Sequence, residues 1–253
     1  MPRNTRSRLL AACMLALALS LSITAVAGAK GFAAELLVVG AKDKVLSEQT
    51  VTSGTTSVKT SPKATCFGKG TGGSGKPVSI AGNTAMGLLA KASKSTSTLR
   101  PLSISDSFDF GLALCGVGKS VAKGGLSWYL KINHKSPSVG GEKAKIHAGD
   151  EVLWALVESD PKTYAYPGEL ALVAPAQVTA GLPFTVTAYS YDEKGKRKPA
   201  AGVSVTGASA VTGSDGKATV VVGVPTLLAA TKSGLIPSAQ VGVCVGNECP
   251  PSG

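Results

Sequence analysis

Residues 127–133, Ser-Trp-Tyr-Leu-Lys-Ile-Asn, and residues 151–158, Glu-Val-Leu-Trp-Ala-Leu-Val-Glu, decide the fold of the first half of this chain. Both stretches are short and rich in aliphatic and aromatic side chains, which is typical of β-strands. The pair Gly149-Asp150 marks the turn that enters the second stretch. We therefore predict two strands, each of which carries one of the chain's two tryptophans, Trp128 and Trp154.

The segments on the N-terminal side of these strands predict more sheet and one short helix. Polar turn residues at Lys42-Asp43 separate two apolar, strand-like runs. Asn83 is a suitable N-cap, and the apolar spacing of the residues after it predicts a helix over 84–92. Further strands are expected at residues 35–39, 44–51 and 107–114, with a glycine- and serine-rich loop at 53–77.

The helix, the strand Trp128–Asn133 and the stretch Ile146–Trp154 together resemble the transcobalamin-like C-terminal domain family. This family is catalogued as a domain of unknown function in bacterial surface proteins. The resemblance implies an α+β domain, a sheet with one short helix, over residues 30–166. His134 stands where the family commonly has glycine. In the vertebrate namesakes the domain covers one face of a corrinoid, but no contact residue here could be matched to that role.

The second half of the chain alternates strand-like runs with turns and has no helical pattern between them. Residues 183–191 alternate with period two, and Asp215-Gly216 is a hairpin signal. Short, evenly spaced strands predict a β-sandwich. The stretches 180–187, 202–205 and 214–218 resemble a bacterial immunoglobulin-like domain, expected over 168–246 with a tail at 247–253. The other strands are expected at 169–174, 202–206, 217–222, 226–231 and 240–245, after a proline-containing connector at 161–168.

The first 29 residues have the pattern of a secretory signal peptide. Three arginines precede an apolar run, and Ala27 or Ala29 ends a small-residue cleavage site. A membrane anchor is the alternative, because the run is near the length of about 18 residues that spans a bilayer. A lipid-attachment motif ends at Cys13, but most of the apolar run lies after that cysteine. We expect cleavage, an extracellular or cell-surface location, and no transmembrane segment in the mature chain.

The charge balance favours anionic partners. The formal net charge is +11, and it falls to +8 when the three arginines of the leader are removed. Outside a cell, such a surface attracts wall polymers, lipid head groups or extracellular DNA. The one dense basic run, residues 194–198, lacks interleaved aromatic residues and is interpreted as a solvated turn. The expected partner is therefore an extracellular ligand or an anionic cell-envelope component, with no specific nucleic acid.

Four cysteines remain after cleavage, and an even number in an exported chain predicts disulfides. Three connectivities are possible. Position in the chain favours Cys66 with Cys115 and Cys244 with Cys249, one pair in each half. The first would stabilise the fold by about 4 kcal/mol on the chain-entropy model. A metal site is disfavoured because neither pair has the Cys-x-x-Cys spacing.

No stretch of the sequence assembles a catalytic site. Residues 113–120 match a phosphate-loop pattern, and residues 70–76 approach it. The glycines that follow residue 120 make a poor helix, and a phosphate loop needs a helix at that place. His147 and Asp150 could form a base and its orienter without a nucleophile. His134 is interpreted as an exposed residue, and Glu142, Asp150 and Glu151 as solvated charges. We expect no enzyme activity, no cofactor and no metal.

Trp128 and Trp154 offer two interpretations. Both could pack in the core of the sheet and helix. Alternatively, Trp128, Tyr129 and Trp154 could form a ligand-binding platform. The sequence therefore predicts an exported, non-enzymatic binding or scaffold protein, with the first half as the binding unit and the second as a spacer. The alternative is an extracellular protein that binds a small, corrinoid-like molecule in an apolar pocket.

Overall fold

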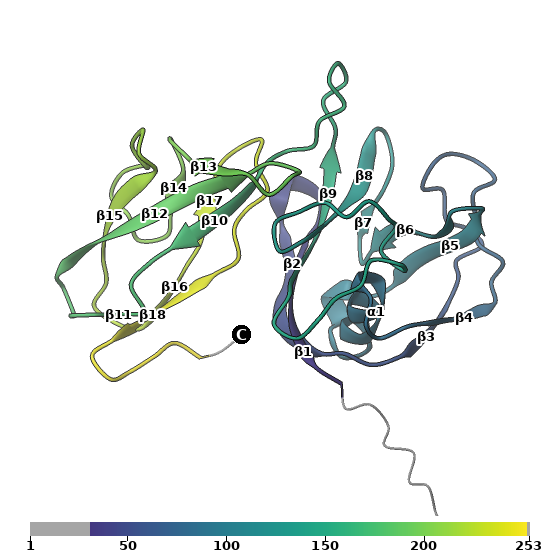
Figure 1. Ribbon diagram of the computed structural model, residues 1–253, viewed down its shortest axis with the longest axis horizontal. Helices are drawn as coiled ribbons and strands as arrows, with labels where there is room; N and C mark the ends of the chain where they lie inside the picture. The colour runs from purple at the N-terminus through teal and green to yellow at the C-terminus, as the bar shows by residue number, and fades with distance from the viewer. Residues whose placement is uncertain (1–30, 252–253) are drawn as a thin grey trace, which may run out of the picture. The chain divides into compact units, whose positions relative to one another are not determined.

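The computed structural model describes residues 31–251, and the predicted leader with Ala27 and Ala29 lies outside them. The fold is mainly β, as expected, with a single α-helix among the described residues (Figure 1). No helix in this part of the chain has the length and apolarity needed to cross a membrane.

The central sheet of the first half contains the two predicted tryptophan strands side by side. Its strand order is β2-β1-β9-β8, so β8 and β2 are its edges. β1 and β9 run parallel, and the other two pairs are antiparallel. The bounds are β1 Ala33–Val39, β2 Val45–Thr52, β8 Leu126–Ile132 and β9 Glu151–Glu158.

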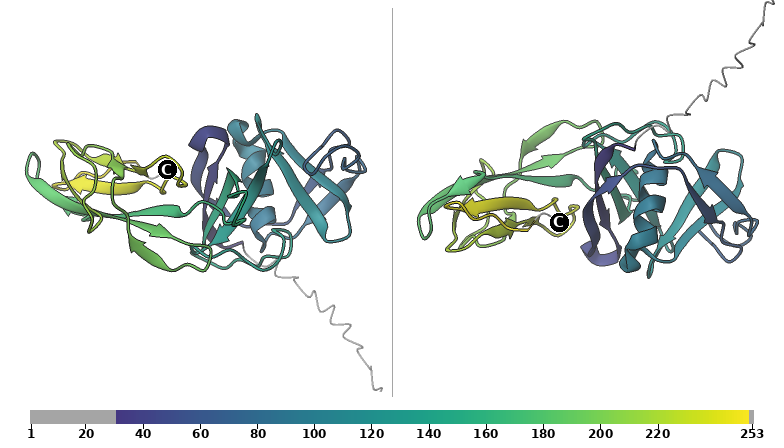
Figure 2. Two further views of the ribbon diagram at one scale, coloured as in Figure 1. Left: turned by 90° about the horizontal axis from the view of Figure 1, so that it is seen from above. Right: turned by 90° about the horizontal axis from the view of Figure 1, so that it is seen from below.

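The helix α1, Ala85–Ser95, packs against one face of this sheet, and Figure 2 shows it beside β1 and β2. Its N-cap is Thr84, whose Oγ1 accepts the backbone N–H of Gly87 at 3.1 Å. The prediction of Asn83 as the cap was therefore wrong by one residue. Asn83 instead uses its backbone carbonyl to accept the N–H of Ile146 at 3.1 Å.

Two other predictions for the first half were also wrong. The run 107–114 is not one strand, because the chain reverses at Asp109-Phe110 between two antiparallel strands. The expected loop at 53–77 contains strand β3 and reaches the start of β4, and these two strands pair with each other. The additional elements are β3 Thr56–Lys59, β4 Pro77–Ile80, β5 Leu102–Phe108, β6 Gly111–Val117, β7 Ser120–Val121 and short 3₁₀ helices at Ala41–Asp43 and Ser97–Leu99.

The second half consists of short strands around an apolar core, which is the β-sandwich-like arrangement that the alternating pattern predicted. Strand β12 is the longest and pairs with β10, β13 and β15. The alternate burial along β12 places Val186 and Ala188 in the core. The strands are β10 Glu169–Val173, β11 Gln177–Val178, β12 Pro183–Tyr191, β13 Arg197–Pro199, β14 Ser204–Val205, β15 Lys217–Val221, β16 Thr226–Leu228, β17 Ala230–Thr231 and β18 Val241–Val245.

The two faces of the β2-β1-β9-β8 sheet are buried by different parts of the chain. Leu36 and Val38 point into the core that contains α1. Leu37 and Val39, on the opposite face as the period of two requires, pack in a cluster that includes Ile236 of the second half. The connector and the second half therefore complete the burial of a sheet that the first half covers on one side only.

Both disulfides join the cysteines that were expected from their positions. Cys66 is bonded to Cys115 in β6, and Cys244 in β18 is bonded to Cys249. The Cα–Cα distances are 4.6 and 4.1 Å. The first bond attaches the long loop after β3 to the strand β6 and so fixes the position of Phe67, which follows Cys66 directly.

Candidate functional site

A groove of about 300 Å³ lies along the edge strand β8, and all three residues predicted to bind a ligand line it. The chain has twelve aromatic residues, and six of them face this one groove. Such enrichment is typical of binding sites, because aromatic side chains offer a large contact area. The six are Phe67, Phe110, Trp128, Tyr129, Trp154 and Tyr166.

The two tryptophans are core residues and groove residues at the same time. Trp154 is 4% exposed and packs in the cluster around α1, where its Nε1 donates to the carbonyl of Ala85 at 3.4 Å. Trp128 is partly buried, and its Nε1 has no hydrogen-bond partner among the described residues. A buried donor without a partner costs about 1–3 kcal/mol. Trp128 therefore lines the groove with its ring and keeps a buried donor without a partner within residues 31–251.

Tyr129 is a second polar group without a hydrogen bond. Its ring is 5% exposed and stacks on Tyr166 at 4.3 Å between centroids, whereas its hydroxyl has no partner in the part of the chain that the structure describes. Burial raises the pKa of this hydroxyl to about 12. Ser136, whose contact with the hydroxyl falls short of hydrogen-bond geometry, offsets a part of that rise. The hydroxyl is thus a neutral, unused donor.

Trp128 and Tyr129 point to opposite faces of the sheet, and both line the groove because it runs along the free edge of β8. The hydrogen bonds at the two ends of β8 show which of its backbone groups face this edge. The backbone N–H groups of Leu126 and Ile132 donate to Lys123 and Lys135, outside the sheet, at 3.1 and 2.8 Å. The odd-numbered Asn133 instead donates its backbone N–H toward β9, to the carbonyl of Glu151 at 2.9 Å.

This alternation places the backbone N–H and C=O groups of Trp128 and Leu130 on the side of β8 away from β9. Neither N–H donates a hydrogen bond beyond the β8–β9 ladder in the described residues. An open edge of this kind can pair with another extended chain. The groove therefore combines aromatic walls with unused main-chain donors and acceptors.

The rim of the groove carries exposed apolar side chains. Phe67 is 64% exposed, Phe110 56% and Val139 47%. The ring of Phe108 holds the other two phenylalanines, at centroid distances of 5.3 Å to Phe67 and 4.9 Å to Phe110. Contiguous exposed apolar groups beside a cavity mark an interaction surface.

Three aromatic groove residues were not predicted from the sequence, namely Phe67, Phe110 and Tyr166. Phe67 could have been found from the predicted Cys66–Cys115 disulfide, because that bond carries the loop to β6. Phe110 lies in the turn between β5 and β6, which had been predicted as continuous strand. Tyr166 lies in the proline-containing connector, and no pattern in the sequence indicated its stacking on Tyr129.

His134 is not the simple exposed residue that was expected. Its side chain is 24% exposed, its ring stacks on Tyr191 at 3.9 Å, and its Nδ1 lies 3.0 Å from Glu169 Oε1. The hydrogen bond with Glu169 raises the pKa of His134, and nearby Glu151 adds to the rise. Glu169 also contacts the buried Lys131, so these side chains connect β8 with β10.

The other chemical motifs of the sequence form no site. Residues 113–120 lead from β6 through a turn into strand β7, not into a helix that could hold a phosphate. His147 is 81% exposed and 3.5 Å from Asp150. Asp150 itself is not a solvated charge, because it is 15% exposed and accepts from Asn133 Nδ2 at 2.8 Å. No group of three or more potential metal ligands occurs within residues 31–251.

The comparisons with known proteins add no identity. No protein-family model matches this chain, and no curated protein is significantly similar to it.

Proposed function

We propose that this is an exported, non-enzymatic binding protein whose first half, a transcobalamin-like domain, holds an extended apolar segment of a partner polypeptide in the groove along β8. The immunoglobulin-like second half supports and presents that domain. The observation that carries the proposal is the coincidence of six aromatic side chains with the open edge of β8.

An extended peptide is the ligand class that uses both features of the groove. Its main chain would pair with the free N–H and C=O groups of Trp128 and Leu130, which is recognition by strand addition. Alternate side chains of an added strand point to one face, so apolar residues at every second position would meet the aromatic wall.

A corrinoid-like ligand is the second candidate, and the aromatic lining with both tryptophans favours it. The volume of about 300 Å³ lies at the lower limit of small-molecule pockets, so the groove would cover only one side of a large macrocycle. A peptide strand needs no deeper cavity, because its other face stays in solvent. The peptide is therefore the better match to this shallow site.

Export is supported by the leader pattern and by the two disulfides, which persist in oxidising surroundings. An exported protein meets the unfolded tails and linkers of other surface proteins. These are extended chains that a strand-addition site can capture without unfolding a partner domain.

Selection of linear peptides from a random library on the folded protein tests the proposal. We expect enriched peptides with apolar residues at alternate positions, and we expect their binding to change the fluorescence of the two tryptophans, both of which line the groove. Methylation of the peptide's backbone nitrogens that face β8 leaves the side chains intact and should reduce binding at least tenfold, whereas methylation of those that face away should not. Cobalamin is the parallel ligand, followed by its absorbance after gel filtration. Binding of cobalamin alone, with no peptide enriched, would contradict the peptide proposal.

A further inference from the structure

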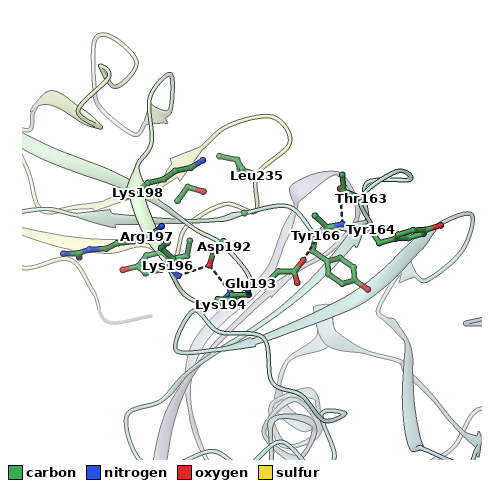
Figure 3. Close-up of a pocket in the computed structure, with 14 residues that line it drawn as sticks. Thr163, Tyr164, Tyr166, Asp192, Glu193, Lys194, Lys196, Arg197, Lys198 and Leu235 are labelled. Atoms are coloured by element: carbon green, nitrogen blue, oxygen red, sulfur yellow. Dashed lines mark hydrogen bonds between the residues drawn. The ribbon is translucent and has the colours of Figure 1, made fainter.

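A second hollow, of about 720 Å³, lies beside the turn between β12 and β13 and shares Tyr166 with the groove (Figure 3). Four cationic residues line it, all exposed: Lys194, Lys196, Arg197 and Lys198. The opposite wall comes from the connector, residues 163–166. The basic run that the sequence indicated as a solvated turn is therefore one side of a concave surface.

The two acidic residues of this hollow form no ion pair with its cations, and their charges offset only two of the four positive charges. Asp192 Oδ1 accepts the backbone N–H groups of Lys194 at 2.9 Å and Lys196 at 2.8 Å. Glu193 Oε1 accepts the N–H of Tyr166 at 2.9 Å (Figure 3). Both carboxylates are thus engaged with the main chain, and the hydrogen bond from Lys196 lowers the pKa of Asp192 and keeps it ionised.

None of the four cations pairs with a carboxylate. Within residues 31–251, the carboxylate partners at 4.0 Å or less belong to Lys131, His134, His147 and Lys217 only. Four like charges within five residues repel one another, so an anion that enters the hollow relieves repulsion as well as forming new contacts.

The turn that carries the cations is held in place by the main chain. Ser136 N donates to the carbonyl of Glu193 at 2.9 Å, and Gly195 N donates to that of Asp192 at 3.1 Å. Gly195 has a φ of +75°, the left-handed conformation that glycine adopts without strain. The lysines therefore extend from a defined backbone, which reduces the entropy that binding must overcome.

The tyrosines around the hollow indicate recognition of phosphate groups and not of bases. Tyr166 already stacks on Tyr129, Tyr191 on His134, and the Tyr189 ring lies 4.7 Å below the guanidinium of Arg197. Tyr164, at 77% exposed, is the one lining tyrosine whose ring has no such contact in the described residues. Proteins that bind single strands through bases need several free rings in succession.

We infer that this hollow, defined by Lys194, Lys196, Arg197 and Lys198, binds a linear phosphate polyanion through its charges, which is an activity distinct from peptide binding in the groove along β8. The four cations are exposed and follow one another closely along the chain, so a linear ligand with closely repeated charges can contact them in succession. Phosphate binding by lysine is mainly electrostatic, so affinity should fall steeply with salt.

Titration with long-chain inorganic polyphosphate tests the inference. The variant with Lys194→Gln, Lys196→Gln and Lys198→Gln removes three charges and leaves the contact between Arg197 and Tyr189. The matched control, Lys63→Gln, Lys69→Gln and Lys123→Gln, removes three exposed and unpaired charges from the first half. We expect the first variant to bind polyphosphate at least tenfold more weakly at low salt, with a flatter salt dependence, and the control to change affinity less than twofold.

The other probes separate the sources of phosphate. If oligo(dT) binds with an affinity similar to that of polyphosphate, and the hollow variant loses affinity for both equally, the result supports recognition of the phosphate chain. If the protein bound oligo(dT) but did not bind polyphosphate, the inference would be wrong. It would also be wrong if the protein bound only to vesicles that contain phosphatidylglycerol. Equal losses in the two variants would also overturn it, because net charge and not this hollow would then be responsible. Unchanged circular dichroism in both variants verifies that they are folded.

Discussion

Lys131 and Glu169 form a buried ion pair between the two halves of the chain: Lys131 Nζ lies 3.0 Å from Glu169 Oε2, and their side chains are 1% and 9% exposed. Lys131 comes from β8 and Glu169 begins β10. Ionised groups are seldom buried unless they are paired, because desolvation of each charge costs several kcal/mol. The pair therefore fixes where the second half attaches to the sheet that carries the groove.

Glu169→Leu should destabilise the protein by about 3–5 kcal/mol, because it leaves the Lys131 ammonium buried without a counter-charge. The contact of Lys131 Nζ with the carbonyl of Tyr191, at 3.4 Å, is too weak to replace the carboxylate. The double variant with Lys131→Met removes both charges and should recover most of the loss. Urea unfolding measures both, and equal stabilities for the single and the double variant would show that the pair is not coupled.

Stability should fall as the pH rises above about 6.5, and His134 should cause part of this fall. The pKa of His134 is raised in the folded state, chiefly by its hydrogen bond with Glu169. A raised pKa means that this stabilisation is complete below the unfolded value of about 6.5 and is lost as pH rises through the folded value. Thermal unfolding from pH 5.5 to 9 should show a steeper decline for the unmodified protein than for His134→Gln. Parallel curves would exclude this role.

Tyr129→Phe should not destabilise the protein. The hydroxyl has no hydrogen-bond partner among the described residues, so its removal should leave the free energy of unfolding unchanged or raise it by up to about 1 kcal/mol. A loss of stability above 1 kcal/mol in urea unfolding would mean that the hydroxyl has a partner in the free protein.

Gly141→Ala should disturb the wall of the groove, whereas Gly140→Ala should not. A Cβ at Gly141 would lie 2.5 Å from Cη2 and Cζ2 of Trp154, and a Cβ at Gly140 would meet nothing within 4 Å. We expect Gly141→Ala to displace the indole, change the near-ultraviolet circular dichroism and cost about 1–3 kcal/mol by overpacking. The same spectrum for both variants would argue against close packing of this loop on Trp154.

Replacement of Cys66 and Cys115 by serine should lower the free energy of unfolding by about 2–5 kcal/mol, the usual cost of losing a native disulfide. It should also weaken peptide binding, because the loop that holds Phe67 at the rim is released from β6. Replacement of Cys244 and Cys249 is the control, since that bond closes a short segment away from the groove. Peptide binding that is unaffected by the first change would remove Phe67 from the site.

Local sequence patterns predicted the strands well because their causes are local. The strands at 151–158 and 183–191 have the predicted bounds, since turn residues flank regular apolar runs. The N-cap was misplaced because Asn83 and Thr84 are both good caps, and tertiary contacts decide between them. The run 107–114 was predicted as one strand because its residues are mostly strand-like, whereas Asp109-Phe110-Gly111 forms a turn within it.

The candidate site was predictable only in part. Trp128, Tyr129 and Trp154 attracted attention because they lie on recognisable strands. That β8 is an edge strand depends on sheet order, which no local pattern contains. The contacts of His134 and Lys131 with Glu169 could not be predicted either, because Glu169 lies 35 or more residues after them in the chain. Such contacts arise only when the second half covers the sheet.

Amide hydrogen exchange of β8, measured by nuclear magnetic resonance on the full mature protein with and without a selected peptide, tests the central claim most directly. In the free protein, the Trp128 and Leu130 amides should exchange much faster than those of Tyr129 and Lys131, because only the latter face β9. Bound peptide should protect Trp128 and Leu130 and leave Tyr129 and Lys131 unchanged. Equal protection of all four amides in the free protein, or no added protection when peptide binds, would contradict strand addition at this edge.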